Sequence, residues 1–394
     1  QTADIIGLPR AISDEIFARA KKQFKLDRAD LLLCCSHTHS GPVVGMNLNV
    51  MFDFTPEEKN RVMSYAAQLT ENILKAIGTA LSNLAPATLA TGHGKVTFAI
   101  NRRQRTQTGA IALGINPTGP IDHDVPVLAV TSPEGKLRAV FFGYACHTTT
   151  ISTKGKDPAD FYRIHGDYAG VAEEELEKRY PAAIAMFTIL CGGDQNPEPR
   201  GSLELAIEHG RTLANEVNRL LNSDLRPVRG PIRSAHENIQ LDFALHTRQT
   251  FEEELKRAED PKKPNKYLAR RARLMLEAYD AGKPVRHTTY PVQAIRFGNT
   301  LTLLALGGEV VVDYQLRAKR EYPRENLMVI GYANDVMCYI PSLRVLREGG
   351  YEVEGSMIYY GQPGPLAETV EDRVFQAVHR VMSRVGAKPV TAQP

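Results

Sequence analysis

Residues 125–147, VPVLAVTSPEGKLRAVFFGYACH, decide the fold class. Two apolar runs flank the tetrapeptide SPEG at 132–135, and proline and glycine at its centre are typical of a turn, so the stretch predicts an antiparallel β-hairpin. Residues 290–308 repeat the pattern around a turn at 299–300. Hairpins interrupt the regular strand–helix alternation of a (β/α)8 barrel, which was the alternative fold for a metal hydrolase.

Helical and strand patterns alternate around these hairpins. Thr55, followed by Pro56 and two acids, marks a helix N-terminus. Helices are predicted at 15–24, 56–83, 168–180, 202–222, 310–320 and 367–385, and further strands at 29–37, 86–100, 182–193 and 326–333. This order favours a layered α/β domain with a mixed β-sheet and an active site at the strand ends. We expect a single domain over 1–394, with a charged helical excursion at 251–285.

The composition excludes several classes of protein. The chain has 394 residues, of which 43% are hydrophobic and 24% charged, as in globular domains with a substantial core. The net charge is only +3 and no basic block is present, so no nucleic-acid partner is expected. No apolar run reaches the roughly 18 residues of a membrane-spanning helix. The chain has five cysteines, an odd number, and most of them adjoin apolar runs, which favours buried free thiols. The cysteines therefore do not indicate the cellular compartment.

Polar residues that can bind a metal or act in catalysis directly follow several of the apolar runs. His37 and His39 follow ADLLLCC, and His147 ends the first hairpin. If the chain is extended at SHTHSGP (36–42), positions 37 and 39 point to the same face and both imidazoles reach one small target. A metal ion is the economical target. The alternative is a pair of histidines bonded to backbone, and His147 taken alone fits a hydrogen-bonded core histidine better than a ligand.

Glu309 lies between the apolar runs LALGG and VVV, so its carboxylate is predicted to be partly buried. A buried carboxylate needs a cationic partner. That partner could be a metal, or Arg317 or Arg320 in an ion pair. Two histidines and a carboxylate with an open position suit a catalytic Zn2+, which lowers the pKa of bound water toward about 7.

A series of motifs resembles the neutral/alkaline (non-lysosomal) ceramidase family. In chain order they are SHTHSGP, INRR, ACHTTT, HGDYAG, CGGDQNP, LGGEVV and ANDVMCYIP followed by GGYE. The resemblance implies a zinc-dependent amidase that splits ceramide into sphingosine and a fatty acid. It implies four metal ligands, which are His37, His147, Glu309 and Tyr339.

The same resemblance implies three catalytic residues. His39 would act as the acid/base or transition-state residue, and Arg102 and Tyr351 would donate to the oxyanion. From the residues alone, Arg102 could be surface charge like its neighbours Arg103 and Arg105, and both tyrosines could serve packing. Asp167, Asp194 and Asn196 are instead expected to shape loops.

The resemblance also bears on partners and context. It implies a lipid substrate with transient membrane-surface contact, and it favours a secreted or extracytoplasmic location, which the sequence itself does not decide. Members of that family usually begin earlier and often carry a β-sandwich after the catalytic domain. This sequence starts at Gln1 and ends soon after its closing helix, so the resemblance implies that both parts lie outside it. Two alternatives stay open: a metal hydrolase for a different amide or ester, and a non-catalytic relative that binds a lipid or glycan.

Overall fold

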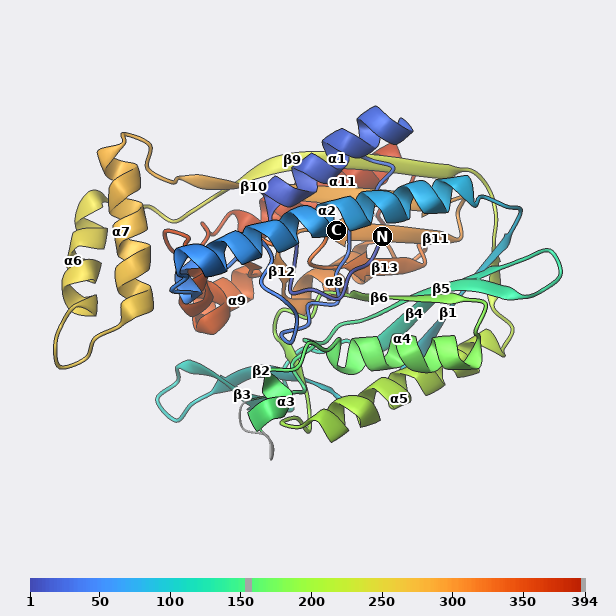
Figure 1. The fold of residues 1–394 in the computed structure, drawn as a ribbon, viewed down its shortest axis with the longest axis horizontal. Coiled ribbons are helices and arrows are strands. Elements are labelled where there is room, and N and C mark those ends of the chain that lie inside the picture. The colour runs from blue at the N-terminus through green and yellow to red at the C-terminus, as the bar shows by residue number, and fades with distance from the viewer. Residues whose placement is uncertain (153–157, 391–394) are drawn as a thin grey trace.

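Two mixed β-sheets form the centre of the computed structural model, which describes residues 1–152 and 158–390 (Figure 1). The first sheet has the order β6 (Ile184–Ile189), β5 (Leu137–Tyr144), β4 (Asp124–Thr131), β1 (Thr88–Lys95) and β8 (Arg226–Val228). The second has the order β13 (Leu327–Ile330), β11 (Leu301–Leu306), β10 (His287–Phe297) and β9 (Ile232–Asp242). Only β5–β6 and β11–β13 are parallel pairs within these sheets.

Both predicted hairpins are confirmed. Strands β4 and β5 pair antiparallel, with Val127 opposite Phe142, and β10 pairs antiparallel with β11. The mixed strand order confirms the layered α/β class and excludes the eight-stranded parallel barrel.

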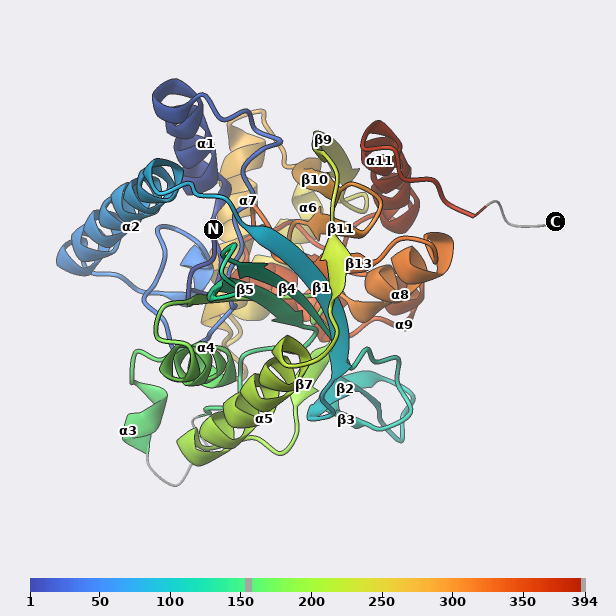
Figure 2. The ribbon, with the colours of Figure 1, turned by 90° about the vertical axis from the view of Figure 1, so that its right-hand side faces the viewer.

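Helices cover both sheets. Helices α4 (Asp167–Arg179) and α5 (Leu203–Leu221) lie along one face of the first sheet (Figure 2). Helix α11 (Val370–Arg384) packs on β9 and β10 of the second sheet. Helices α1 (Arg10–Phe24) and α2 (Pro56–Ser82) pack on each other. Helix α2 begins with the capping box that the sequence predicted, since Thr55 accepts from the Glu58 amide and the Glu58 side chain accepts in return.

The remaining elements are short or lie at the edge of the molecule. A small three-stranded sheet has the order β3 (Ile111–Asn116), β2 (Ala99–Arg105) and β7 (Gln195–Pro197), and a two-stranded sheet joins β12 (Glu309–Val310) to β14 (Tyr339–Ile340). The other helices are η1 (Asn49–Met51), α3 (Pro158–Phe161), α6 (Arg248–Ala258), α7 (Lys266–Asp280), α8 (Val312–Glu321), α9 (Leu343–Glu348), η2 (Tyr351–Gly355) and α10 (Ser356–Tyr359). Helices α6 and α7 pack together at one end of the molecule (Figure 1). Within the described ranges, every helix is too short or too polar to cross a bilayer.

The strand predicted at 29–37 is wrong. Residues 31–38 are buried, but they belong to no strand. The Cys34 amide bonds the Gln1 carbonyl, whereas the Cys35 carbonyl accepts from the Ile189 amide. Single hydrogen bonds to different segments do not build a ladder, so the apolar run is buried without joining either sheet.

The two sheets meet where strands β6 and β13 end. Leu190 forms an isolated bridge with Ile330, and an apolar cluster containing Leu32, Ala145 and Met328 fills the junction. The chain then leaves both sheets at the same place. The junction therefore brings together side chains that are far apart in the sequence.

Candidate metal centre

The short parallel pair β12–β14 places two of the predicted ligands side by side. Glu309 is in register with Tyr339. The glycine loop after β6 passes directly behind them, because a Cβ at Gly193 would lie 2.8 Å from the Glu309 carbonyl oxygen. Only glycine allows that approach.

Two buried histidines point at the same spot. Nδ1 of His147 lies 2.7 Å from the Gly192 carbonyl oxygen, and Nδ1 of His37 lies 2.5 Å from the Ile6 carbonyl oxygen. A carbonyl only accepts, so each Nδ1 carries the proton and each Nε2 keeps a free lone pair. That tautomer is the one that a metal ligand requires.

The four predicted ligand atoms converge. Oε2 of Glu309 is 3.2 Å from Nε2 of both His37 and His147, and Tyr339 Oη is 3.1 Å from His147 Nε2. All four residues are at most 3% exposed. A tetrahedral Zn2+ with ligands at about 2.0–2.1 Å separates them by roughly 3.3 Å, so the donor set fits such an ion in type and spacing.

The backbone at His37 differs from the prediction. We expected an extended chain, but the φ of His37 is 59°, in the left-handed region that non-glycine residues rarely adopt. The two imidazoles still meet, since Nε2 of His39 is 3.2 Å from Nε2 of His37. The ligand atoms of His37, His39 and His147 lie within 4.8 Å of one another, and these three side chains could hold a metal ion.

The charge of Glu309 matches a cation site. Burial alone would raise the pKa of its carboxyl group, but positive charge at the His37 and His147 rings holds that pKa well below its ordinary value, and a cation on the neutral rings would supply the same charge. Within the described residues, no ion pair joins Glu309 to Arg317 or Arg320. Arg317 instead pairs with Glu321 and Glu371. The alternative of an arginine partner for Glu309 is therefore wrong.

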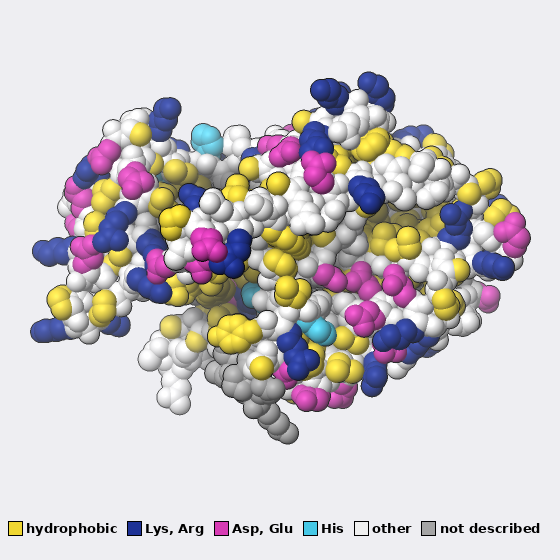
Figure 3. Space-filling model, viewed as in Figure 1, with side chains coloured by type: hydrophobic (Ala, Val, Ile, Leu, Met, Phe, Trp, Pro, Cys, Tyr) yellow, Lys and Arg dark blue, Asp and Glu magenta, His cyan; other side chains and the backbone are white. Residues whose placement is uncertain are grey.

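His39 differs from the other histidines because it is exposed and lines a cavity of about 420 Å³. Its walls are mainly apolar and include Ile6, Pro42, Val43, Val44, Leu48, Met51, Phe52 and Ile164. Figure 3 shows hydrophobic side chains around a recess of this face. An apolar chain could occupy this cavity with its polar end at His39.

Arg102 is buried, not a surface charge. Its Nη2 donates to Tyr339 Oη at 2.9 Å, and its guanidinium carbon lies 5.5 Å from the centroids of both the Tyr339 and Tyr351 rings. The described residues offer the Tyr351 hydroxyl no hydrogen-bond partner. Burial raises the pKa of that hydroxyl, so it keeps its proton and can donate to a substrate.

Two residues that the sequence analysis missed support the site. Tyr360 Oη donates to Glu309 Oε1 at 2.5 Å, and Glu352 accepts from Arg102 Nε at 2.8 Å. Tyr360 follows a helical stretch, where an aromatic residue suggests only packing. Glu352 could have been suspected because it adjoins the predicted Tyr351.

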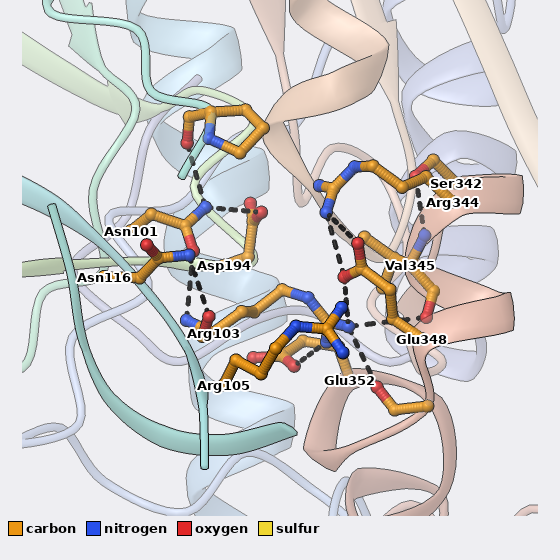
Figure 4. A network of polar contacts seen from close by, with 12 residues as sticks. Asn101, Arg103, Arg105, Asn116, Asp194, Ser342, Arg344, Val345, Glu348 and Glu352 are labelled. Atoms are coloured by element: carbon orange, nitrogen blue, oxygen red, sulfur yellow. Dashed lines mark hydrogen bonds and ion pairs between the residues drawn. The ribbon is translucent and has the colours of Figure 1, made fainter. Parts of the chain in front are cut away.

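Asp194 and Asp167 serve as loop-shaping groups. Asp194 accepts from the Val312 amide and from Asn101 Nδ2 (Figure 4), and Asp167 accepts from the Ile151 amide. These bonds hold the chain close to the candidate ligands Glu309 and His147.

The comparisons with known proteins support the fold. No family model matches the sequence, and no curated protein is significantly similar to it. A neutral ceramidase from Pseudomonas aeruginosa superposes with a TM-score of 0.68 at 18% identity, covering 100% of this chain and 67% of that chain. A ceramidase complexed with C2 superposes with a TM-score of 0.71, also at 18% identity, covering 100% of this chain and 68% of the other. The chain therefore has a neutral ceramidase-like fold.

Proposed function

We propose that the chain is a zinc-dependent amidase that cleaves ceramide or a related N-acyl lipid into a sphingoid base and a fatty acid. The observation that carries the proposal is the convergence of Glu309, Tyr339 and the Nε2 atoms of His37 and His147 at 3.1–3.2 Å separations. The fold agrees, because both similar structures are described as ceramidases.

These four side chains would hold the ion. A bound Zn2+ would supply a Lewis acid for the acyl carbonyl and a water molecule of lowered pKa as the nucleophile. The protein's contribution is to fix the donors in advance, through the carbonyls behind both histidines and the Tyr360 hydroxyl behind Glu309.

The remaining polar residues suit amide cleavage. Tyr351 carries a free hydroxyl, and it would donate to the oxygen of the acyl group as negative charge develops there. Arg102 retains N–H groups beyond those bonded to the protein and would add positive charge on the same side. His39, at the edge of the cavity, would pass a proton to the leaving amine.

The apolar cavity favours a lipid substrate. Its walls would take a hydrocarbon chain, with the scissile amide at His39. Exposed Tyr162 and Ile164, which are 81% and 79% exposed and line this cavity, would contact the membrane surface transiently. The sequence contains no block of lysine and arginine residues, so we propose no nucleic-acid partner.

The test uses chelated protein reloaded with Zn2+ at one equivalent per chain. It would be incubated with a panel of N-acyl sphingoid bases, other fatty amides and fatty esters, and free fatty acid would be measured. We expect release from the N-acyl sphingoid bases that chelation abolishes and Zn2+ restores, and none from Glu309→Gln. Activity that survives chelation, or a metal-loaded protein that binds these lipids without cleaving any of the panel, would overturn the proposal.

A further inference from the structure

Glu352 is a fully enclosed carboxylate that bonds two arginines at once. It lies in η2 directly after Tyr351 and is 0% exposed. Its Oε1 accepts from Arg102 Nε at 2.8 Å and its Oε2 from Arg103 Nη1 at 2.6 Å. Enclosing a carboxylate is favourable only when such partners remain in place.

The bond to Glu352 controls the orientation of Arg102. A guanidinium is planar, so fixing Nε and one terminal nitrogen fixes the whole group. Glu352 holds Nε, and this leaves Nη2 directed at Tyr339 Oη at 2.9 Å. Nη1 makes a longer bond of 3.3 Å to Asn196 Oδ1, which alone would not define the plane.

Arg103 anchors the other side of Glu352 to the scaffold. Its Nη2 donates to the Gly349 carbonyl at 2.9 Å and to Glu348 Oε2 at 3.1 Å, at the C-terminal end of α9 (Figure 4). Its Nε has no partner in the described structure, so the two terminal nitrogens carry all the side-chain bonds of Arg103. Arg103 is 2% exposed, so water does not substitute for these bonds.

The bridge also balances charge. Arg102 and Arg103 are neighbours on β2 and would repel each other in a buried setting without an anion between them. Burial alone would raise the pKa of Glu352, but the two guanidinium groups hold it below its ordinary value, so the carboxylate is ionised.

We infer that Glu352 is a positioning residue for catalysis, which sets the guanidinium of Arg102 against the hydroxyl of Tyr339 while Arg103 ties it to α9. Within the described residues, Glu352 bonds no candidate metal ligand and does not line the cavity. Because Tyr351 precedes it in the chain, the same bridge fixes the start of the segment that carries the proposed oxyanion donor. This inference rests on the proposed function.

The first test is structural and needs no activity. In a crystal structure of metal-free Glu352→Gln, the amide would present N–H groups to one arginine, so we expect Arg102 Nη2 to leave Tyr339 Oη by more than 1 Å. An unmoved Arg102 would overturn the inference, whatever the enzyme turns out to hydrolyse.

The second test is kinetic, with the Zn2+-loaded protein and whichever N-acyl substrate it cleaves. We expect Glu352→Gln to lower kcat by about 10- to 100-fold, with KM and Zn2+ content almost unchanged. In a double-mutant cycle, adding Glu352→Gln to Arg102→Lys should lower kcat no further. Multiplicative effects would mean that Glu352 acts independently of Arg102 and would refute the inference.

The matched control is Glu254→Gln. Glu254 is 5% exposed and bonds Arg271 within the α6–α7 pair, away from the metal centre. The Glu254→Gln substitution should lower the free energy of unfolding and leave kcat unchanged. If Glu352→Gln does not fold, Glu352→Asp can be tested in its place, because it keeps the charge and shortens the side chain between the two arginines. A normal kcat in Glu352→Asp together with a displaced Arg102 would also refute the inference. A wild-type protein that cleaves no N-acyl lipid would count against the proposed function alone.

Discussion

Removing the Tyr360 hydroxyl tests how strongly it holds the candidate metal ligand Glu309 in place. In Tyr360→Phe the ring stays, but Glu309 Oε1 loses its donor at 2.5 Å. Glu309 is 3% exposed, so water cannot readily replace that donor. The carboxylate then rotates more freely, and its pKa rises because one stabilising bond to the charged form is gone.

The expected effect is on metal affinity. A hydrogen bond to a charged group contributes about 1.5–3 kcal/mol, which corresponds to roughly 10- to 150-fold in a binding constant. Losing the partners behind a ligand commonly weakens metal binding by about 10- to 100-fold. We therefore expect the Kd for Zn2+ to rise by about one to two orders of magnitude in Tyr360→Phe.

The assay is competition with a chromophoric chelator at fixed pH, with wild type, Tyr360→Phe and Tyr359→Phe measured in parallel. Tyr359 is the neighbouring tyrosine on α10, and its hydroxyl bonds no candidate ligand, so its removal should change the Kd less than twofold. If Tyr360→Phe binds Zn2+ as tightly as wild type while Glu309→Gln does not, Glu309 needs no support from Tyr360 and the reasoning fails.

Three further predictions concern single side chains. His37→Ala should lose both Zn2+ and activity, whereas His39→Ala should keep Zn2+ by elemental analysis and lose activity; loss of metal in both would make His39 a ligand. Tyr351→Phe should lower kcat far more than it raises KM, since its bond forms mainly in the transition state, and equal changes in both constants would point to substrate binding instead. Burial would lower the pKa of His93, but the Asp124 carboxylate at 2.9 Å raises it above the ordinary value. This pair therefore stabilises the fold below about pH 6.5 and the effect fades as the pH rises through the raised pKa. Urea unfolding of His93→Gln should show a deficit of at most about 1 kcal/mol at pH 6 that shrinks by pH 9, and a deficit independent of pH would contradict it.

The main strands and helices could be predicted because their signals are local. The β4–β5 hairpin is visible in the turn at 132–135, and α2 in its capping box and proline. Strands β12 and β14 have only two residues each and were not predicted, since their pairing depends on the distant junction of the two sheets. The strand predicted over the apolar run at 31–35 was wrong because a buried segment outside any sheet has the same apolar pattern as a buried strand.

The site was partly predictable for a similar reason. Glu309 could be suspected because a carboxylate between apolar runs needs a partner, whereas the ligand role of His147 was predicted only from the family resemblance. Tyr360 and Glu352 could not be predicted, because their partners Glu309 and Arg102 are distant in the sequence and meet them only in the folded chain. The position of a residue in the sequence therefore helps to identify candidate ligands and catalytic residues. It is a poorer guide to the residues that hold them in place.

Backbone strain gathers at the same centre. Six non-glycine residues of the described chain have positive φ, and three of them, His37, Tyr332 and Asn334, with φ of 59°, 55° and 67°, lie at this centre. The Tyr332 ring lies 4.3 Å from that of His37, and Asn334 bonds both the amide and the carbonyl of Leu33. Each such conformation costs on the order of 1 kcal/mol or more and persists only where the surroundings enforce it. Three of them around one set of candidate donors mean that the fold holds His37 in a geometry that its own backbone does not prefer, as preorganisation of a metal ligand would require.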